Sequence, residues 1–385
     1  MRGIVVRLVS LGTVLVVTMS APGCSRMELN ERGFILGAAI DETADGKLEL
    51  TTQFYKPNEG TTAATPKKAS SFNIRTTGYS VFDAARDLTV HLGRKAQWSH
   101  MQAILIGEDL ARKRPLGDIL DFFYRDDEPR LTTPILITQG KAGPYLDEKP
   151  YIEKTISRQF KGAGQSATQY SGKSVEMNLL ELQSQLNTET GAAVMPYVYI
   201  QQKEPKHAVV SGGALITKGV LVGKLAPDQV HAYLMLLSKF RSGIVPIPCD
   251  KNEDQSESFE VQTTETKLVP RIDREALSVT VHMNVSGTVR ELVCSSLMKP
   301  EDHVAFQGKI EATLERQMRE FIQSLQKRKA DVLEIGNDLY KKHPRLWKSW
   351  KEDWDDRFSQ LPFEYRIQVR ISNTGLGGWK STFEP

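Results

Sequence analysis

LSVTVHMNVS, residues 277–286, is the clearest structural signal in the chain. Its apolar residues alternate with polar ones, and this period of two predicts a strand with one apolar and one polar face. A second alternating run covers residues 363–371, and between the two runs residues 302–329 carry apolar residues at helical spacing. Strands covered by a long amphipathic helix predict an α+β domain at residues 259–376.

Strand and helix patterns alternate in the N-terminal half. The strand patterns lie at 33–40, 48–54, 100–106 and 131–138, and the helical patterns lie at 81–92, 108–112 and 116–124. The first two strands flank a turn-forming segment that closes with Asp45-Gly46, which predicts a hairpin. The remaining alternation is typical of α/β layers, so we expect a mixed α/β and α+β fold of two to three domains of small sheets covered by helices.

Shifts in composition divide the chain. We expect a signal peptide at 1–23, an N-terminal α/β domain at 24–200 with a loop at 56–70, a middle hairpin and helix region at 201–250, and the C-terminal domain at 259–376. The middle hairpin turns at Lys218-Gly219. The polar stretch 250–258 reads as a linker, and the Gly-rich stretch 159–173 is expected to be exposed, ahead of a helix that begins at Val175.

Cys24 follows a leader that has the features of a secretory signal. Arg2 and Arg7 precede an apolar run at 8–19, and small residues at 20–23 lead directly into the cysteine. This order is typical of bacterial lipoproteins, in which the cysteine is acylated and becomes the new N-terminus. The alternative is an uncleaved anchor helix, and both interpretations place the body of the protein outside the cytoplasm.

Charge and hydropathy restrict the partners. Removal of residues 1–23 takes two arginines and no acids from a total of 50 basic and 47 acidic side chains, which leaves a formal net charge of +1. This balance gives no reason to expect binding to nucleic acid. No later apolar stretch approaches the roughly 18 residues that cross a bilayer, so we expect the N-terminus to be the membrane attachment.

Cys249 and Cys294 are the other two cysteines of the chain. Two thiols without metal-ligand spacing favour unpaired, buried side chains, and a disulfide is the alternative outside the cytoplasm. The seven histidines form no metal-binding pattern with each other or with acids. We therefore expect no metal and no cofactor.

Three further motifs contain residue types that can carry chemistry. ATQYSGKS at 167–174 satisfies the loose form of the P-loop, but no buried strand precedes it, so an exposed loop with Ser174 as a helix N-cap is favoured. The acids at 126–128 fit a solvated turn better than a calcium or acid–base site. Trp347 and Trp354 fit the packing face of a helix better than a ligand platform. We therefore expect no catalytic residues and no enzyme activity.

An ordered set of segments resembles one family, the GerC-type spore germination lipoproteins. The segments are GC at 23–24, ELNE at 28–31, FILGAAID at 34–41, HMQAILIGEDLA at 100–111, ILDFFYRD at 119–126, ADVL at 330–333, Gly336, YKKHP at 340–344, Trp347, WD at 354–355, LP at 361–362 and NTGL at 373–376. Two regions depart from the family pattern. Ser25 and Arg26 replace the Trp and Asp that commonly follow the lipid cysteine, and residues 141–173 have no matching part.

The resemblance implies a function as the C subunit of a nutrient germinant receptor of endospore-forming bacteria. Such a subunit is lipid-anchored, here through Cys24, on the outer face of the spore inner membrane. It acts with a transmembrane A subunit and an integral-membrane B subunit in receptor assembly and signalling. The alternative from another functional class is a free-standing solute-binding lipoprotein that delivers its ligand to a transporter.

Overall fold

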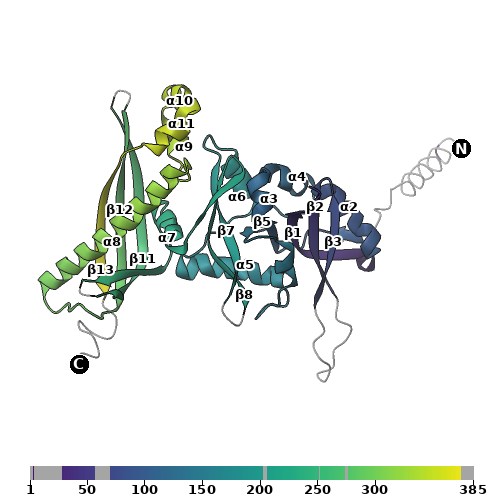
Figure 1. Cartoon of the computed structure of the whole chain (residues 1–385), viewed down its shortest axis with the longest axis horizontal. Coiled ribbons are helices and arrows are strands. Elements are labelled where there is room, and N and C mark those ends of the chain that lie inside the picture. The colour runs from purple at the N-terminus through teal and green to yellow at the C-terminus, as the bar shows by residue number, and fades with distance from the viewer. Residues whose placement is uncertain are drawn as a thin grey trace, which may run out of the picture.

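Two β-sheets organise the chain, and Figure 1 shows them at opposite ends of its long axis. The computed structural model describes Gly3 and residues 28–56, 70–202, 206–250, 252–273 and 276–373. The expected lipid site Cys24, nearly all of the expected signal peptide and most of the expected loop at 56–70 lie outside these residues. We call residues 28–225 the N-terminal lobe and residues 243–373 the C-terminal lobe.

The N-terminal lobe is built on nine strands in the order β3-β2-β1-β5-β6-β7-β8-β9, with β4 beside β1. The strands are β1 (Arg32–Glu42), β2 (Leu48–Tyr55), β3 (Ser71–Gly78), β4 (Lys95–Gln97), β5 (Ala103–Gly107), β6 (Ile135–Thr138), β7 (Ala192–Gln201), β8 (His207–Thr217) and β9 (Val220–Leu225). The central strands β1, β5, β6 and β7 are parallel. The predicted hairpins are confirmed as β1–β2 and β8–β9.

Helices cover both faces of this sheet. One face packs against α2 (Val81–Leu92), α3 (Glu108–Lys113), α4 (Leu116–Arg125) and α6 (Leu179–Leu186). The other face packs against α5 (Ile156–Ser166) and the short turn η2 (Gly143–Asp147). Consecutive residues of β5 point to opposite faces, so Ile104 belongs to the first core and Leu105 to the second. Both side chains are fully buried, as expected for parallel strands covered on both faces.

The C-terminal lobe has four strands in the order β10-β11-β12-β13. They are β10 (Gly243–Cys249), β11 (Asn252–Asp273), β12 (Ala276–Glu291) and β13 (Phe363–Asn373), and β13 runs parallel to β12. The helix α8 (Pro300–Lys327) lies along one face, as Figure 1 shows. The predicted apolar stripe is confirmed, since its members are all buried: Ile310, Leu314, Met318, Phe321 and Leu325. The opposite face carries exposed polar side chains such as Asn284, Arg366 and Gln368.

Both edges of the four-stranded sheet carry features that restrict further pairing. At one edge, β10 contains Pro246 and Pro248, which have no backbone N–H to offer a neighbouring strand. At the other edge, the backbone N–H of Val369 donates to the Glu311 carboxylate at 2.9 Å. The amide of Gln307 donates to the Val369 carbonyl at 3.2 Å, so side chains from α8 occupy the outer hydrogen-bonding groups of this residue.

One apolar core joins the lobes. The helix α7 (Pro227–Leu236) contacts β8, β11 and α8, and buried residues of β7 and β8 belong to the same cluster as the core of the C-terminal sheet. Three short helices follow α8, namely α9 (Ile335–Lys342), α10 (Pro344–Trp350) and α11 (Trp354–Ser359). Because the apolar contact is continuous, we expect the lobes to move as one body.

Three local expectations were wrong. The stretch 250–258 is not a linker, because β11 begins at Asn252 and pairs with β10 and β12. The stretch 159–173 is not an exposed loop, because Ile156 and Phe160 lie one helical turn apart and anchor α5 in the core. The helix expected from Val175 begins at Leu179 instead. Asn178 caps it in a capping box with Glu181, so Ser174 is not its N-cap.

Candidate functional site

The P-loop-like segment has the wrong surroundings for phosphate. Residues 167–171 continue α5 as a π-helical turn, and Gly172 follows in the left-handed region with φ 61°. A Cβ atom at Gly172 would lie 2.2 Å from the Phe240 ring, so this glycine allows close packing. Nucleotide binding needs a strand before the glycine-rich loop and a helix after it, and here a helix precedes the loop. The segment is therefore structural.

The acids at 126–128 serve a turn, as expected. The Asp126 carboxylate accepts the backbone N–H of Glu128 at 3.0 Å. The Glu128 carboxylate accepts the backbone N–H of Trp98 at 3.1 Å and pairs with Lys95 at 3.0 Å. Within the described parts of the chain, no group of three or more His, Cys, Asp or Glu side chains could hold a metal ion.

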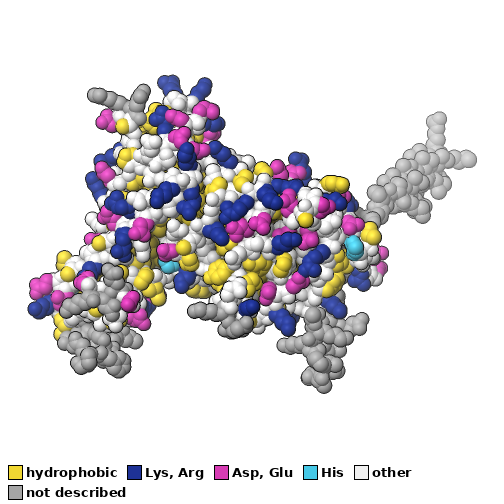
Figure 2. All heavy atoms as spheres, in the orientation of Figure 1, with side chains coloured by type: hydrophobic (Ala, Val, Ile, Leu, Met, Phe, Trp, Pro, Cys, Tyr) yellow, Lys and Arg dark blue, Asp and Glu magenta, His cyan; other side chains and the backbone are white. Residues whose placement is uncertain are grey.

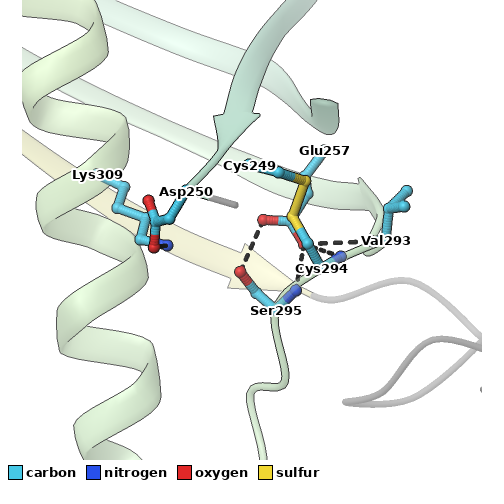
Figure 3. The surroundings of a disulfide bond; sticks show 7 residues. All are labelled: Cys249, Asp250, Glu257, Val293, Cys294, Ser295 and Lys309. Atoms are coloured by element: carbon cyan, nitrogen blue, oxygen red, sulfur yellow. Dashed lines mark hydrogen bonds and ion pairs between the residues drawn. A yellow bond between two sulfur atoms is a disulfide. The ribbon is translucent and has the colours of Figure 1, made fainter. Parts of the chain in front are cut away.

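The two later cysteines form a disulfide, which corrects the expectation of unpaired thiols. Cys249 ends β10 and Cys294 follows β12, with their Cα atoms 6.0 Å apart. Figure 3 shows the neighbouring Glu257 carboxylate pointing at the same turn. This carboxylate accepts three consecutive backbone N–H groups, from Val293, Cys294 and Ser295, at 3.2, 3.2 and 2.8 Å. The pairing of β11 with both β10 and β12 brings the two cysteines together, and their spacing in the sequence does not show it.

The Trp-rich segment packs against a buried carboxylate. Trp347 and Trp354 lie edge to face with ring centroids 5.2 Å apart, and both are buried. Asp331 accepts the Trp354 indole N–H at 3.2 Å and the backbone N–H of Gly336 at 2.7 Å. Burial raises the pKa of Asp331 to about 6, although these hydrogen bonds act to lower it. The expectation that these tryptophans pack within the fold is confirmed, although they lie on two helices, α10 and α11, and not on one.

Hydrogen bonds connect this segment to the N-terminal lobe. Thr190 precedes β7, and its backbone N–H donates to the Asn337 side chain at 3.2 Å. The adjacent Glu189 carboxylate accepts the Trp347 indole N–H at 3.0 Å and pairs with Lys351 at 3.1 Å. We call these contacts, together with Asp331 and Trp354, the inter-lobe joint. Because its polar groups are mutually satisfied and its aromatic rings are packed, the joint can hold the lobes at a fixed angle.

The carboxyl ends of the parallel strands are the usual place for a site in an open α/β sheet. Here two carboxylates, those of Asp41 and Glu108, have partners within the fold. The Asp41 carboxylate accepts the backbone N–H groups of Ala142 and Gly143 at 2.7 and 2.8 Å. Glu108 accepts the Tyr197 hydroxyl at 2.6 Å and pairs with Arg112 at 2.7 Å. Burial raises the pKa of Asp41. Burial also acts to raise the pKa of Glu108, but its hydrogen bonds together with the nearby Lys224 and Arg112 cations lower that pKa overall.

A groove of about 560 Å³ lies between α2 and α4, and sequence reasoning did not find it. Val81 and Phe82 from α2 and Phe122 from α4 supply its apolar surface. Arg86 lies with its guanidinium 4.8 Å from the Phe82 ring centroid, while aspartates line the α4 side. We call this hollow the α2–α4 groove. The exposed Phe82 in an otherwise regular helix was the available signal, because a solvent-facing Phe interrupts the amphipathic pattern.

No helix in the described ranges is both long and apolar enough to span a bilayer. Cys24 itself lies outside those ranges, so its acylation stays a prediction.

Comparison with known proteins identifies the family. Residues 25–200 match the model of the spore germination protein N-terminal domain, and residues 211–375 match the spore germination B3/GerAC-like C-terminal model. Three curated relatives come from Bacillus subtilis (strain 168). Spore germination protein KC is 24% identical, with 94% of this chain and 95% of the relative covered. Spore germination protein B3 is 25% identical, with 91% and 93% covered. Spore germination protein A3 is 24% identical, with 95% and 97% covered.

A solved structure shares the fold. The crystal structure of the GerBC protein superposes with a TM-score of 0.56 at 23% sequence identity, covering 88% of this chain and 97% of that one. The two family models together match most of the sequence, in the order in which they occur here. The chain therefore belongs to the GerAC-like family of spore germination proteins.

Proposed function

We propose that this protein is a subunit of a spore nutrient germinant receptor, and that it contributes to receptor assembly and signalling instead of catalysing a reaction. The match of both halves to spore germination models carries this proposal. Its partners would be the transmembrane A subunit and the integral-membrane B subunit of the same receptor. The internally paired clusters at Asp41, Glu108 and Asp331 are consistent with structural roles for the buried acids.

The attachment to the membrane is part of the same proposal. The leader and Cys24 support a lipid anchor, which would hold the protein on the outer face of the spore inner membrane. Two acyl chains give stable anchoring, at about 0.8 kcal/mol per buried CH₂. Labelled fatty acid should enter the wild-type protein and should be absent from Cys24→Ser. Equal labelling of both proteins would reject Cys24 as the lipid site.

Gene deletion tests the receptor role. Spores that lack this protein should lose response to nutrients while they still germinate when core ions or dipicolinate are released directly. The second treatment is the control, because it bypasses the receptor. An unchanged nutrient response in a strain without a compensating paralogue would overturn the proposal.

The alternative function is a free-standing solute-binding lipoprotein. The α2–α4 groove favours this alternative, since its volume of about 560 Å³ lies within the range of small-molecule sites. Tight and saturable binding of one small solute to the purified protein would support it. Neighbouring genes for an ATP-binding transporter, in place of receptor A and B genes, would support it further.

The division into domains at 24–200, 201–250 and 259–376 stays a prediction about independently folding units. The first family model ends at residue 200 and the second begins at residue 211, yet β7 and β8 pair within one sheet across this boundary. A fragment that ends between β7 and β8 therefore tests the division.

A further inference from the structure

We propose that the α2–α4 groove docks a segment of a partner subunit that presents apolar side chains flanked by Lys or Arg. This inference rests on the proposed function, since it names the contact surface of the same receptor subunit.

The shape suits a packed segment. Phe82 of α2 keeps 46% of its surface exposed, although its ring lies beside that of Phe122 of α4, with ring centroids 5.8 Å apart. Trp98 packs edge to face on Phe122 at 5.1 Å and supports the floor from below. An aromatic floor with one partly exposed ring, which the Arg86 guanidinium flanks, resembles the grooves that accept amphipathic helices.

The charge of the groove selects the kind of partner. Four aspartates line it, at positions 118, 121, 126 and 127, against two arginines at 86 and 125. Asp121 is paired with Arg125 at 2.7 Å, and Asp126 caps the turn at Glu128. Within the described chain, Asp118 and Asp127 have no ion-pair partner. The two free carboxylates at the rim would favour basic side chains beside the apolar contact.

The position of the groove places it near the proposed anchor. β1 begins beside the end of α2, where Gly33 approaches Leu92, and Arg32 pairs in register with Lys95 of β4. Lys95 contacts Glu128, directly after the aspartates of the groove. Cys24 lies four positions before Glu28 in the sequence, which limits the distance between them to about 14 Å in a fully extended chain.

The anchor would therefore hold this end of the N-terminal lobe at the membrane. Figure 1 shows α2 and α4 at the end of the long axis opposite the C-terminal sheet. In Figure 2 the surface over these helices carries apolar, acidic and basic side chains close together. This end of the molecule would therefore be the one nearest to a membrane-embedded partner.

The experiment uses the full chain, produced from its own locus in spores, with a photo-crosslinking residue at position 82. We expect a crosslink to the A or the B subunit of the same receptor. In separate strains, Phe82→Asp should lower co-purification of these subunits at least tenfold, because a carboxylate would be buried against the apolar contact. Asp118→Asn with Asp127→Asn should lower it about threefold to tenfold.

Matched controls separate docking from folding. Val90→Asp introduces the same charge on the same helix at a residue that is 81% exposed and outside the groove. Asp109→Asn with Glu265→Gln removes two exposed acids elsewhere. Both controls should co-purify within twofold of wild type. All variants should keep the wild-type melting temperature of the purified protein within a few degrees, since Phe82 is half exposed.

Three outcomes would overturn the docking inference. They are unchanged co-purification of Phe82→Asp together with the double Asn variant, a crosslink from position 82 only to lipid, and a crosslink only to a second copy of this chain. The deletion experiment separates this failure from failure of the receptor role. If deletion abolishes the nutrient response and the groove variants behave as wild type, the receptor role stands and the groove is not its contact surface.

Discussion

The two sheets of this protein are covered in different ways. The nine-stranded sheet has helices on both faces, and its central strands β5 and β6 are buried at every residue. The four-stranded sheet has α8 on one face only, so β13 alternates between partly buried and exposed side chains. The alternation of apolar and polar residues along a strand therefore reports how many faces of its sheet are covered, and it does not report the number of strands.

Truncation between β7 and β8, inside the N-terminal lobe, should disturb folding the most. A fragment of residues 25–202 ends β7 without its antiparallel partner β8, and it also lacks α7. We expect this fragment to show no cooperative thermal unfolding, whereas residues 25–373 unfold in one transition. Thermal unfolding of the two proteins can be followed by circular dichroism. A cooperative melt of the short fragment would show that the N-terminal sheet does not need the strands that follow it.

Paired substitutions test coverage of the faces directly. In β5, Ile104→Ala and Leu105→Ala should each lower the free energy of unfolding by about 2–5 kcal/mol, because both faces are buried. In β12, Met283→Ala should cost as much, whereas the exposed neighbour Asn284→Ala should stay within about 0.5 kcal/mol. Urea titrations measure all four values. A large effect at Asn284 would mean that the second face of the small sheet is covered.

The disulfide should stabilise the less covered lobe. Cys249 and Cys294 close a loop with a sequence separation of 45. Replacing both with Ser should lower the free energy of unfolding by about 2–4 kcal/mol. The drop should match that of wild type measured with reductant, and reductant should leave the double variant unchanged. A drop much larger than with reductant alone would point to lost packing at Cys249 and not to the cross-link.

The inter-lobe joint should respond to pH through Asp331. The pKa of Asp331 is about 6 in the fold and 3.8 as its ordinary value, so the folded state binds the proton more tightly. Stability from this group is complete below about pH 4 and is lost as the pH rises through 6, a change of about 3 kcal/mol. The stability advantage of wild type over Asp331→Asn should therefore shrink from pH 4 to pH 7. An advantage that grows with pH would contradict the raised pKa.

Sequence periodicity predicted the elements whose partners are local or strongly patterned. The hairpin at Lys218-Gly219 formed as expected because both residues adopt positive φ, at 51° and 80°, which suits a tight hairpin turn. The apolar stripe of α8 and the alternation of β12 were equally readable. α5 was missed because glycines and polar residues dilute its apolar face to a few positions such as Ile156 and Phe160.

The candidate sites were less predictable, because they depend on contacts between distant segments. The cysteine pair, the α2–α4 groove and the bond between Thr190 and Asn337 each join residues far apart in the chain. The sequence predicted that the tryptophans pack within the fold, but it did not predict their partner. Nothing in the sequence around Asp331 indicates that its carboxylate accepts the Trp354 indole N–H. The sequence shows which charged and aromatic residues are present, but their contacts become visible only in the folded structure.

The edges of the small sheet have a consequence for copies of this protein held side by side. Tethering to a membrane would raise the local concentration of this protein. Unprotected edge strands of neighbouring copies could then pair with one another. In β10 the two prolines have no backbone N–H to donate to another strand. In β13 the backbone N–H and carbonyl of Val369 are already bonded to the side chains of Glu311 and Gln307. Molecules crowded on a surface can thus remain separate, and contacts are left to faces that select their partner by shape and charge.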